Sequence, residues 1–247
     1  MTNLIFKRYI LKNIKLENYK RDYRLMNHFP NYLKDVLIGL LLSDGGLEKL
    51  SNTSNVRLSV NMFMNNYPYI FHLYNLFEPY IDTDLKIIDV KNLDKIYTTV
   101  RFKTISLPQL LYYYNIFYKK SVIDNKTKKV VPKELDNKFN ALSLAHLIMG
   151  DGNYLKERNI IRIYTNSFIR DDVIFLSHVI NKFLNIKCKV IHDRYNQYII
   201  NIVKEDINLT REVLLPFMHP SMLYKLGIED NIFLIKKFDY FSILNNI

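Results

Sequence analysis

The apolar positions of the chain include two short, nearly uninterrupted runs, and each run ends on Asp-Gly. The first covers residues 37–45 with the sequence LIGLLLSDG, and the second covers residues 144–152 with the sequence LAHLIMGDG. Both are too short to span a bilayer. Five of the six glycines of the chain lie in or beside these runs, and glycine is used where backbones must turn or approach closely. The pattern predicts two buried helices that are related to each other.

Read as a helix, the first run places Gly39 and Ser43 one turn apart on the same face, where a second helix can pack closely. Asp44 then falls at the helix C-terminus, and Gly45 is suited to a left-handed residue that ends the helix. A carboxylate is unfavourable beside the unpaired carbonyls of a helix end, but a divalent cation would take both kinds of oxygen as ligands. Two such helices packed together would bring Asp44 near Asp151 and form a plausible Mg²⁺ site. The alternative is two buried helices that each stop at an ordinary Asp-Gly turn.

The apolar and polar pattern downstream of each run has the same order: strand, helix, two strands, helix. Alternation predicts strands, and a spacing of three to four residues predicts helices. In the first half we expect strands at 56–62, 85–91 and 96–103 and helices at 67–80 and 107–118. In the second half we expect strands at 160–166, 187–192 and 197–204 and helices at 171–184 and from about 209. Asn61-Met-Phe aligns with Asn166-Ser-Phe, and Lys86 with Lys189.

An internal duplication follows from this repeat. The predicted fold is α+β, a mixed α/β arrangement of two pseudo-symmetric half-domains, each with an antiparallel sheet, packed through the two motif helices. We expect a basic N-terminal extension at 1–29, half-domains at 30–118 and 139–247, and a basic connector at 119–138.

Charge and composition limit the kinds of partner that the chain is expected to bind. Lys and Arg number 35 against 24 Asp and Glu, giving a net charge of +11, which favours nucleic acid over a membrane surface. The single Cys188 excludes an internal disulfide and a cysteine zinc site. The aromatic residues at 112–118 are more typical of a core than of a base-stacking platform. Frequent Asn, Ile, Lys and Tyr suggest AT-rich coding DNA and hence an organellar genome.

With these motifs, the chain resembles the LAGLIDADG homing endonucleases of the single-chain, two-motif type. The resemblance rests on LIGLLLSDGGL at 37–47, LSLAHLIMGDGNY at 142–154, Lys128–Pro132 and Met222–Leu226, and it covers roughly residues 33–228. This combination is similar to the fungal mitochondrial group of omega-type intron endonucleases. His146 departs from the family's preference for a small residue, which implies an asymmetric helix interface.

The resemblance implies a saddle of two sheets over DNA and a monomeric, mitochondrial enzyme that cuts both strands of double-stranded DNA to leave 3′ overhangs. It implies Mg²⁺ as the cofactor, with Mn²⁺ as a substitute. Asp44 and Asp151 would be the metal-binding carboxylates, with the carbonyls of Ser43 and Gly150 as further ligands. The other catalytic candidates are Lys129, Lys225, Asn61 and Asn166, the two asparagines as residues that position water. The alternative function is an RNA maturase that binds intron RNA on the same scaffold.

The outward faces of the strands would then read DNA, because Arg, Asn and Gln can bond to base edges in the major groove. The candidates are Arg57, Ser59, Lys86, Thr99, Arg101, Lys103, Arg162, Lys187, Lys189, Arg194, Gln197 and Asn201.

Overall fold

The computed structural model describes residues 17–51, 53–92, 95–121 and 125–228, and within them the chain forms two compact units. The first unit is drawn from Met1–Leu33 and Gly46–Tyr114, and the second from Lys34–Gly45 and Asn115–Ile247. Most of the first motif helix therefore belongs to the same unit as the second motif helix. The half-domain boundaries expected from the sequence stay a prediction, and residues 1–16 of the expected extension lie outside the described residues.

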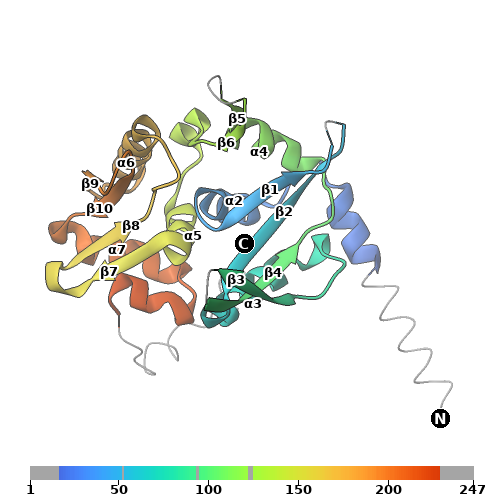
Figure 1. Ribbon diagram of the computed structural model, residues 1–247, viewed down its shortest axis with the longest axis horizontal. Coiled ribbons are helices and arrows are strands. Elements are labelled where there is room, and N and C mark those ends of the chain that lie inside the picture. The colour runs from blue at the N-terminus through green and yellow to red at the C-terminus, as the bar shows by residue number, and fades with distance from the viewer. Residues whose placement is uncertain (1–16, 52, 93–94, 122–124, 229–247) are drawn as a thin grey trace, which may run out of the picture. The chain divides into compact units, whose positions relative to one another are not determined.

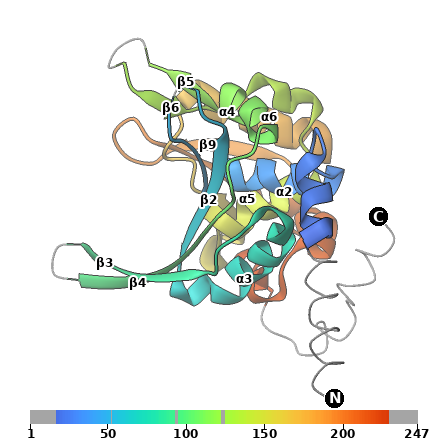
Figure 2. The ribbon, with the colours of Figure 1, turned by 90° about the vertical axis from the view of Figure 1, so that its right-hand side faces the viewer.

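The first unit is built on a four-stranded sheet with the order β1-β2-β4-β3. Its strands are β1 (Gly45–Lys49), β2 (Val56–Phe63), β3 (Lys86–Asn92) and β4 (Lys95–Lys103). Alternate side chains of β2 are buried, as the alternating sequence predicts. Helix α3 (Tyr67–Leu76) packs on the buried face, where Tyr74 meets Phe102 edge to face. The β3–β4 hairpin extends beyond α3 (Figure 2).

The second unit repeats this arrangement with the order β7-β8-β10-β9. Its strands are β7 (Gly152–Leu155), β8 (Ile160–Ile163), β9 (Cys188–His192) and β10 (Tyr198–Ile202), followed by α7 (Ile207–Leu214). Helix α6 (Arg170–Leu184) packs against β9 and β10. The recorded pairings of both sheets are antiparallel, so the α+β fold class with a repeated sheet is confirmed.

The two motif helices, α2 (Asn31–Leu42) and α5 (Ala141–Asp151), lie side by side (Figure 1). A Cβ added to Gly39 would meet the Ser143 carbonyl and stand 2.6 Å from the Cβ of His146. The Ser143 hydroxyl crosses the interface to donate to the Asp35 carbonyl at 3.0 Å. His146 is 1% exposed, so the predicted asymmetry takes the form of a bulky residue on α5 packed against a glycine on α2.

Gly45 corrects one expectation. Among the glycines that the structure describes, only Gly227 has a positive φ, so Gly45 does not end α2 in the left-handed conformation. A Cβ at Gly45 would stand 2.8 Å from the Leu40 carbonyl, and glycine is therefore required by crowding rather than by φ.

Other differences concern short or irregular elements. The sequence patterns missed β1, β7 and the small hairpin of β5 (Tyr118–Lys120) and β6 (Thr127–Lys129). All of this hairpin except Tyr118 lies in the expected connector. The predicted helix at 107–118 is α4 (Gln109–Phe117). Of its four aromatic residues, Tyr113 and Phe117 are buried, Tyr114 is partly exposed and Tyr112 is exposed.

Candidate active site

The two motif acids stand at the ends of the packed helices. Asp151 is the last residue of α5, and Asp44 follows α2 by two residues. A Cβ added to Gly150 would contact Ser43 and stand 3.3 Å from Oδ2 of Asp44, so the two helix ends meet at these residues. The Asp44 side chain is exposed and Asp151 is partly exposed. The predicted pair is therefore brought together at an accessible place in the second unit.

Each helix end also receives a lysine. Lys129 Nζ donates to the carbonyls of Ser43 at 3.2 Å and Gly45 at 2.7 Å. Lys225 Nζ donates to the carbonyls of Met149 at 2.6 Å and Gly150 at 2.5 Å. Cations suit helix C-termini because the last carbonyls have no partner within the helix. The two carbonyls proposed as metal ligands, Ser43 and Gly150, thus already accept a hydrogen bond from an ammonium group.

Local structure fixes both lysines. Lys129 ends β6, and the next residue, Val130, donates its backbone N–H to the Phe117 carbonyl at 2.8 Å. Lys225 lies in the 3-10 segment Pro220–Leu226, which ends at Gly227 with φ +68°. A glycine is required there both by the left-handed backbone and by close contact with the Tyr154 ring.

Burial and mutual repulsion alter the acid–base behaviour of the four groups. Burial, and secondly the neighbouring Asp44, raise the pKa of Asp151 to about 7, while both lysines act in the opposite direction. The pKa of Asp44 is also raised, because protein atoms around its carboxylate displace water even though the residue as a whole is accessible, and Lys225 and Lys129 oppose this shift. Burial lowers the pKa of Lys129 to about 8 and lowers that of Lys225. The pKa values of Asp151 and Lys129 are therefore both brought close to neutral pH.

The donor set fits a hard divalent cation. Within the described part of the chain, the side-chain carboxylates of Asp44 and Asp151 accept no hydrogen bond, and both lysines donate to backbone carbonyls instead. Two close carboxylates resist ionising together unless a cation joins them, and oxygen ligands suit Mg²⁺. Among the described residues no three His, Cys, Asp or Glu side chains gather. A cation at this site would thus keep coordination positions for water or phosphate, as Mg²⁺ commonly does.

The two candidate asparagines do not occupy equivalent positions. Asn61 lies within β2 and pairs with Arg101, which pairs with Lys86. In the second sheet Lys189 pairs with Asn201, which pairs with Arg162. When the two sheets are aligned on the sequence match of Lys86 with Lys189, Arg162 takes the place of Asn61.

The alignment of Asn61 with Asn166 does not agree with this strand register. Asn166 lies beyond the end of β8, and its amide donates to Asp193 Oδ2 at 2.8 Å and to Gln197 Oε1 at 3.3 Å. The difference has a physical cause. The strand predicted at 160–166 ends at Ile163, so the alignment based on sequence similarity used a residue that lies beyond the strand. The shared Lys86–Lys189 match could have found the register.

The predicted DNA-reading residues divide between the two sheets. In the first sheet Arg57 and Lys103 both bind Glu48, at 2.8 Å each; Glu48, in the unrecognised strand β1, was missed. Thr99 is a correction, because it is 7% exposed and its hydroxyl donates to the Ile88 carbonyl. Exposed or partly exposed side chains are kept by Ser59, Lys86, Arg101, Arg162, Lys187, Lys189, Arg194, Gln197 and Asn201.

Several of these side chains have partners within their own sheet. Arg162 donates from Nε to Asn201 Oδ1 at 3.2 Å, and Arg194 donates from Nε to Gln197 Oε1 at 3.1 Å.

No helix of the described residues is long and apolar enough to cross a membrane.

Comparison with known proteins gives one family. A model described as the LAGLIDADG DNA endonuclease family matches residues 34–209. The chain is 28% identical over 221 residues to cytochrome b mRNA maturase bI2 of Saccharomyces cerevisiae, covering 87% of this chain and 52% of that protein. It is 34% identical over 146 residues to intron-encoded endonuclease ai4 of Dictyostelium discoideum, covering 57% of this chain and 82% of that protein. The chain thus spans about half the length of the maturase that it matches.

Among solved structures, the fold is similar to that of the homing endonuclease I-WcaI bound to its DNA recognition sequence. The TM-score is 0.74 at 24% identity, and the match covers 83% of this chain and 91% of that one. At this identity the similarity establishes the fold.

Proposed function

Because this chain belongs to the LAGLIDADG DNA endonuclease family, we propose that it is a site-specific homing endonuclease. It makes a metal-dependent double-strand break in DNA at a long recognition site and so promotes intron homing. The observation that carries the proposal is the pair of carboxylates, Asp44 and Asp151, at the ends of two packed helices whose terminal carbonyls each hold a lysine.

In this proposal Asp44 and Asp151 hold Mg²⁺, with the carbonyls of Ser43 and Gly150 as further ligands and Mn²⁺ as a substitute. Bound Mg²⁺ supplies Lewis-acid activation of water and stabilises the leaving oxygen. The acids act as ligands rather than as bases, so each must be deprotonated when the cation binds. Below the pKa of about 7 that Asp151 has without a cation, cation binding releases a proton, so the affinity for Mg²⁺ falls as the pH is lowered.

The two lysines supply positive charge to the phosphate as negative charge develops on it. The pKa of Lys129 is about 8, so its ammonium group stays mostly charged at neutral pH. Its hydrogen bonds to two carbonyls hold Nζ in place before DNA arrives. The side-chain amides of Asn61 and Asn166 are proposed to position water, and the unequal places of the two residues imply unequal contributions to the two cuts.

The open side of each sheet binds double-stranded DNA in the major groove. Arg57, Lys103 and Arg162 are already held by side chains of their own sheet, which lowers the entropy lost when DNA binds. We further propose that the protein acts as a monomer in mitochondria and leaves 3′ overhangs.

A second candidate function is an RNA maturase that assists splicing of a group I intron. It is favoured by one observation, the 28% identity to a cytochrome b mRNA maturase over 87% of this chain.

The test is cleavage of a plasmid that carries the intron-less form of the host gene, with Mg²⁺ or with EDTA. The proposal expects linear DNA with Mg²⁺ and none with EDTA. Intact plasmid in both samples, together with tight binding to the host intron RNA, would favour the maturase and contradict the nuclease.

A further inference from the structure

The side of the first sheet that faces away from α3, here called the open face, is not uniformly polar. On β2 the buried positions are Val56, Leu58, Val60 and Met62, so Arg57, Ser59, Asn61 and Phe63 point to the open face. Directly paired residues of an antiparallel sheet share a face. The register therefore assigns the open face of β3 and β4 as well.

Along the strands, the side chains on the open face change from basic to apolar between one row of paired residues and the next. Asn61, Arg101 and Lys86 form a basic row across the sheet. The next row is Phe63, Thr99 and Ile88, and the row after that is Tyr97 and Val90. Phe63 is 58% exposed, Val90 43% and Tyr97 38%, and the Phe63 and Tyr97 rings lie 5.8 Å apart.

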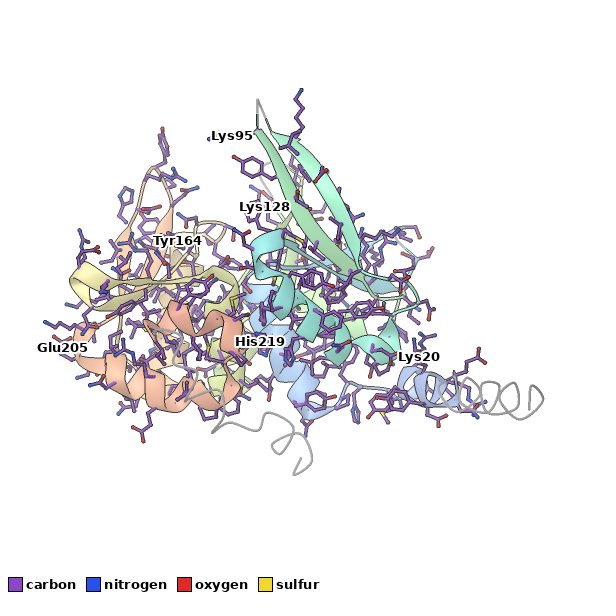
Figure 3. All side chains as sticks on the ribbon, turned by 90° about the horizontal axis from the view of Figure 1, so that it is seen from below. Lys20, Lys95, Lys128, Tyr164, Glu205 and His219 are labelled. Atoms are coloured by element: carbon purple, nitrogen blue, oxygen red, sulfur yellow. The ribbon has the colours of Figure 1, made fainter. Side chains whose placement is uncertain are left out.

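The apolar rows are bounded by charge on both sides. Lys86 and Arg101 precede them, and Lys95, exposed at the far end of the β3–β4 hairpin, follows them (Figure 3). An apolar surface held between cations suits a polyanion that itself carries exposed apolar groups.

The second sheet repeats the same sequence of rows. Its basic row is Arg162, Asn201 and Lys189. One step further along, Ile199 pairs with Ile191, and Tyr164 follows directly after β8 (Figure 3). Tyr164 is 41% exposed and Ile191 37%. On the outer strands both sheets therefore carry exposed apolar side chains beside a basic row, whereas the central residues Thr99 and Ile199 are buried.

Resting on the proposed function, we propose that these apolar rows read thymine methyl groups in the major groove of the target DNA, one contact region in each half-site. The C5-methyl group of thymine is the apolar feature of the major groove, and aromatic or aliphatic side chains contact it. The basic row beside each apolar row binds the phosphates or purine edges of the same DNA segment.

The same chemistry separates DNA from the other partners that an apolar strip could bind. Uracil in RNA lacks the methyl group, and the major groove of an RNA duplex is too deep and narrow for a sheet to read. A protein partner would need apolar and acidic groups placed to match the apolar and basic rows of both sheets.

The experiment begins by selecting bound duplexes from a random DNA pool with the full chain, and then replaces each thymine of the selected site by deoxyuridine. Deoxyuridine keeps the base pair and removes only the methyl group. We expect thymine preference at positions in both half-sites, and a loss of affinity of about 3-fold to 10-fold for each contacted methyl group.

Variants assign each contact to its row. Phe63→Ser should abolish the sensitivity to deoxyuridine in one half-site, and Ile191→Thr should abolish it in the other. Ile87→Thr is the matched control, because Ile87 is 61% exposed on the same hairpin but pairs with Val100 on the opposite face. It should leave the sensitivity intact.

Two results would overturn the inference without touching the proposed function: a selected and cleaved site that is insensitive to deoxyuridine, or equal effects of Ile87→Thr and Phe63→Ser. Tight binding to a single-stranded RNA in preference to any duplex would remove the proposed function and this inference together.

Discussion

At the residue scale, four ionisable groups share the end of the α2–α5 pair. The pKa values of Asp44 and Asp151 are raised, which favours their neutral forms. Burial lowers the pKa values of Lys129 and Lys225. The lysines satisfy backbone carbonyls rather than the carboxylates. The carboxylates therefore remain available to bind a cation. Without a cation, they are harder to ionise.

A pH-dependent stability follows from Asp151. Its pKa in the folded protein, about 7, lies above the ordinary value of 3.8. The contribution of Asp151 to the free energy of unfolding is therefore fully present below about pH 4 and is lost as the pH rises through 7. In EDTA, the free energy of unfolding should fall by roughly 1–3 kcal/mol between pH 5 and pH 7.5. Urea denaturation measures this change.

Asp151→Asn should flatten that profile, whereas Asp171→Asn, at an exposed position in the first turn of α6, should keep the wild-type slope. A wild-type profile in Asp151→Asn would contradict the assignment of the titration to this carboxylate.

If Lys225 acts as proposed, replacing it by methionine should slow cleavage by about 100-fold or more, because this removes the positive charge that the proposal places at the reacting phosphate. DNA binding should be nearly unchanged. The measurement is single-turnover cleavage beside a binding titration, with Lys204→Met as the control that removes the same charge from an exposed position. Equal rates for Lys225→Met and Lys204→Met would show that Lys225 only anchors the end of α5.

At the element scale, the long and regular elements were predictable from sequence and the short ones were not. The strict alternation of β2 and the apolar runs of α2 and α5 each identify an element without tertiary information. Strand β1 begins with two glycines, and its pairing with β2 rather than its own propensity makes it a strand. The role of Gly45 was misjudged because the crowding against Leu40 exists only in the folded chain.

The close approach of α2 and α5 predicts the effect of Gly39→Ala. The added Cβ would collide with the Ser143 carbonyl and stand 3.1 Å from the Leu147 backbone nitrogen. Backbone atoms cannot rotate away, so the helices must separate, and the free energy of unfolding should fall by roughly 1–3 kcal/mol. Thermal or urea denaturation measures this loss.

Asn181→Ala, at an exposed position on α6, serves as the control and should be stable to within about 0.5 kcal/mol. If Gly39→Ala matched this control, the tight packing of the motif helices would be refuted.

At the scale of the whole molecule, the duplication seen in sequence is expressed as two sheets with the same strand order. The four proposed catalytic groups at the helix ends could be nominated from the motifs and their family resemblance. Their geometry could not, because the contacts of Lys129 and Lys225 join residues more than 70 positions apart. The inequality of Asn61 and Asn166 likewise became visible only through the strand register.

The most direct test of the central claim is cleavage of a supercoiled plasmid carrying the target by Asp44→Asn and by Asp151→Asn, followed with Mg²⁺ present. Each substitution removes a carboxylate charge while keeping its shape, so folding and most of the DNA affinity should persist. The account predicts no linear product from either variant, with Asp171→Asn cutting like the wild type. Linear product formed at the wild-type rate by either Asp44→Asn or Asp151→Asn would contradict it.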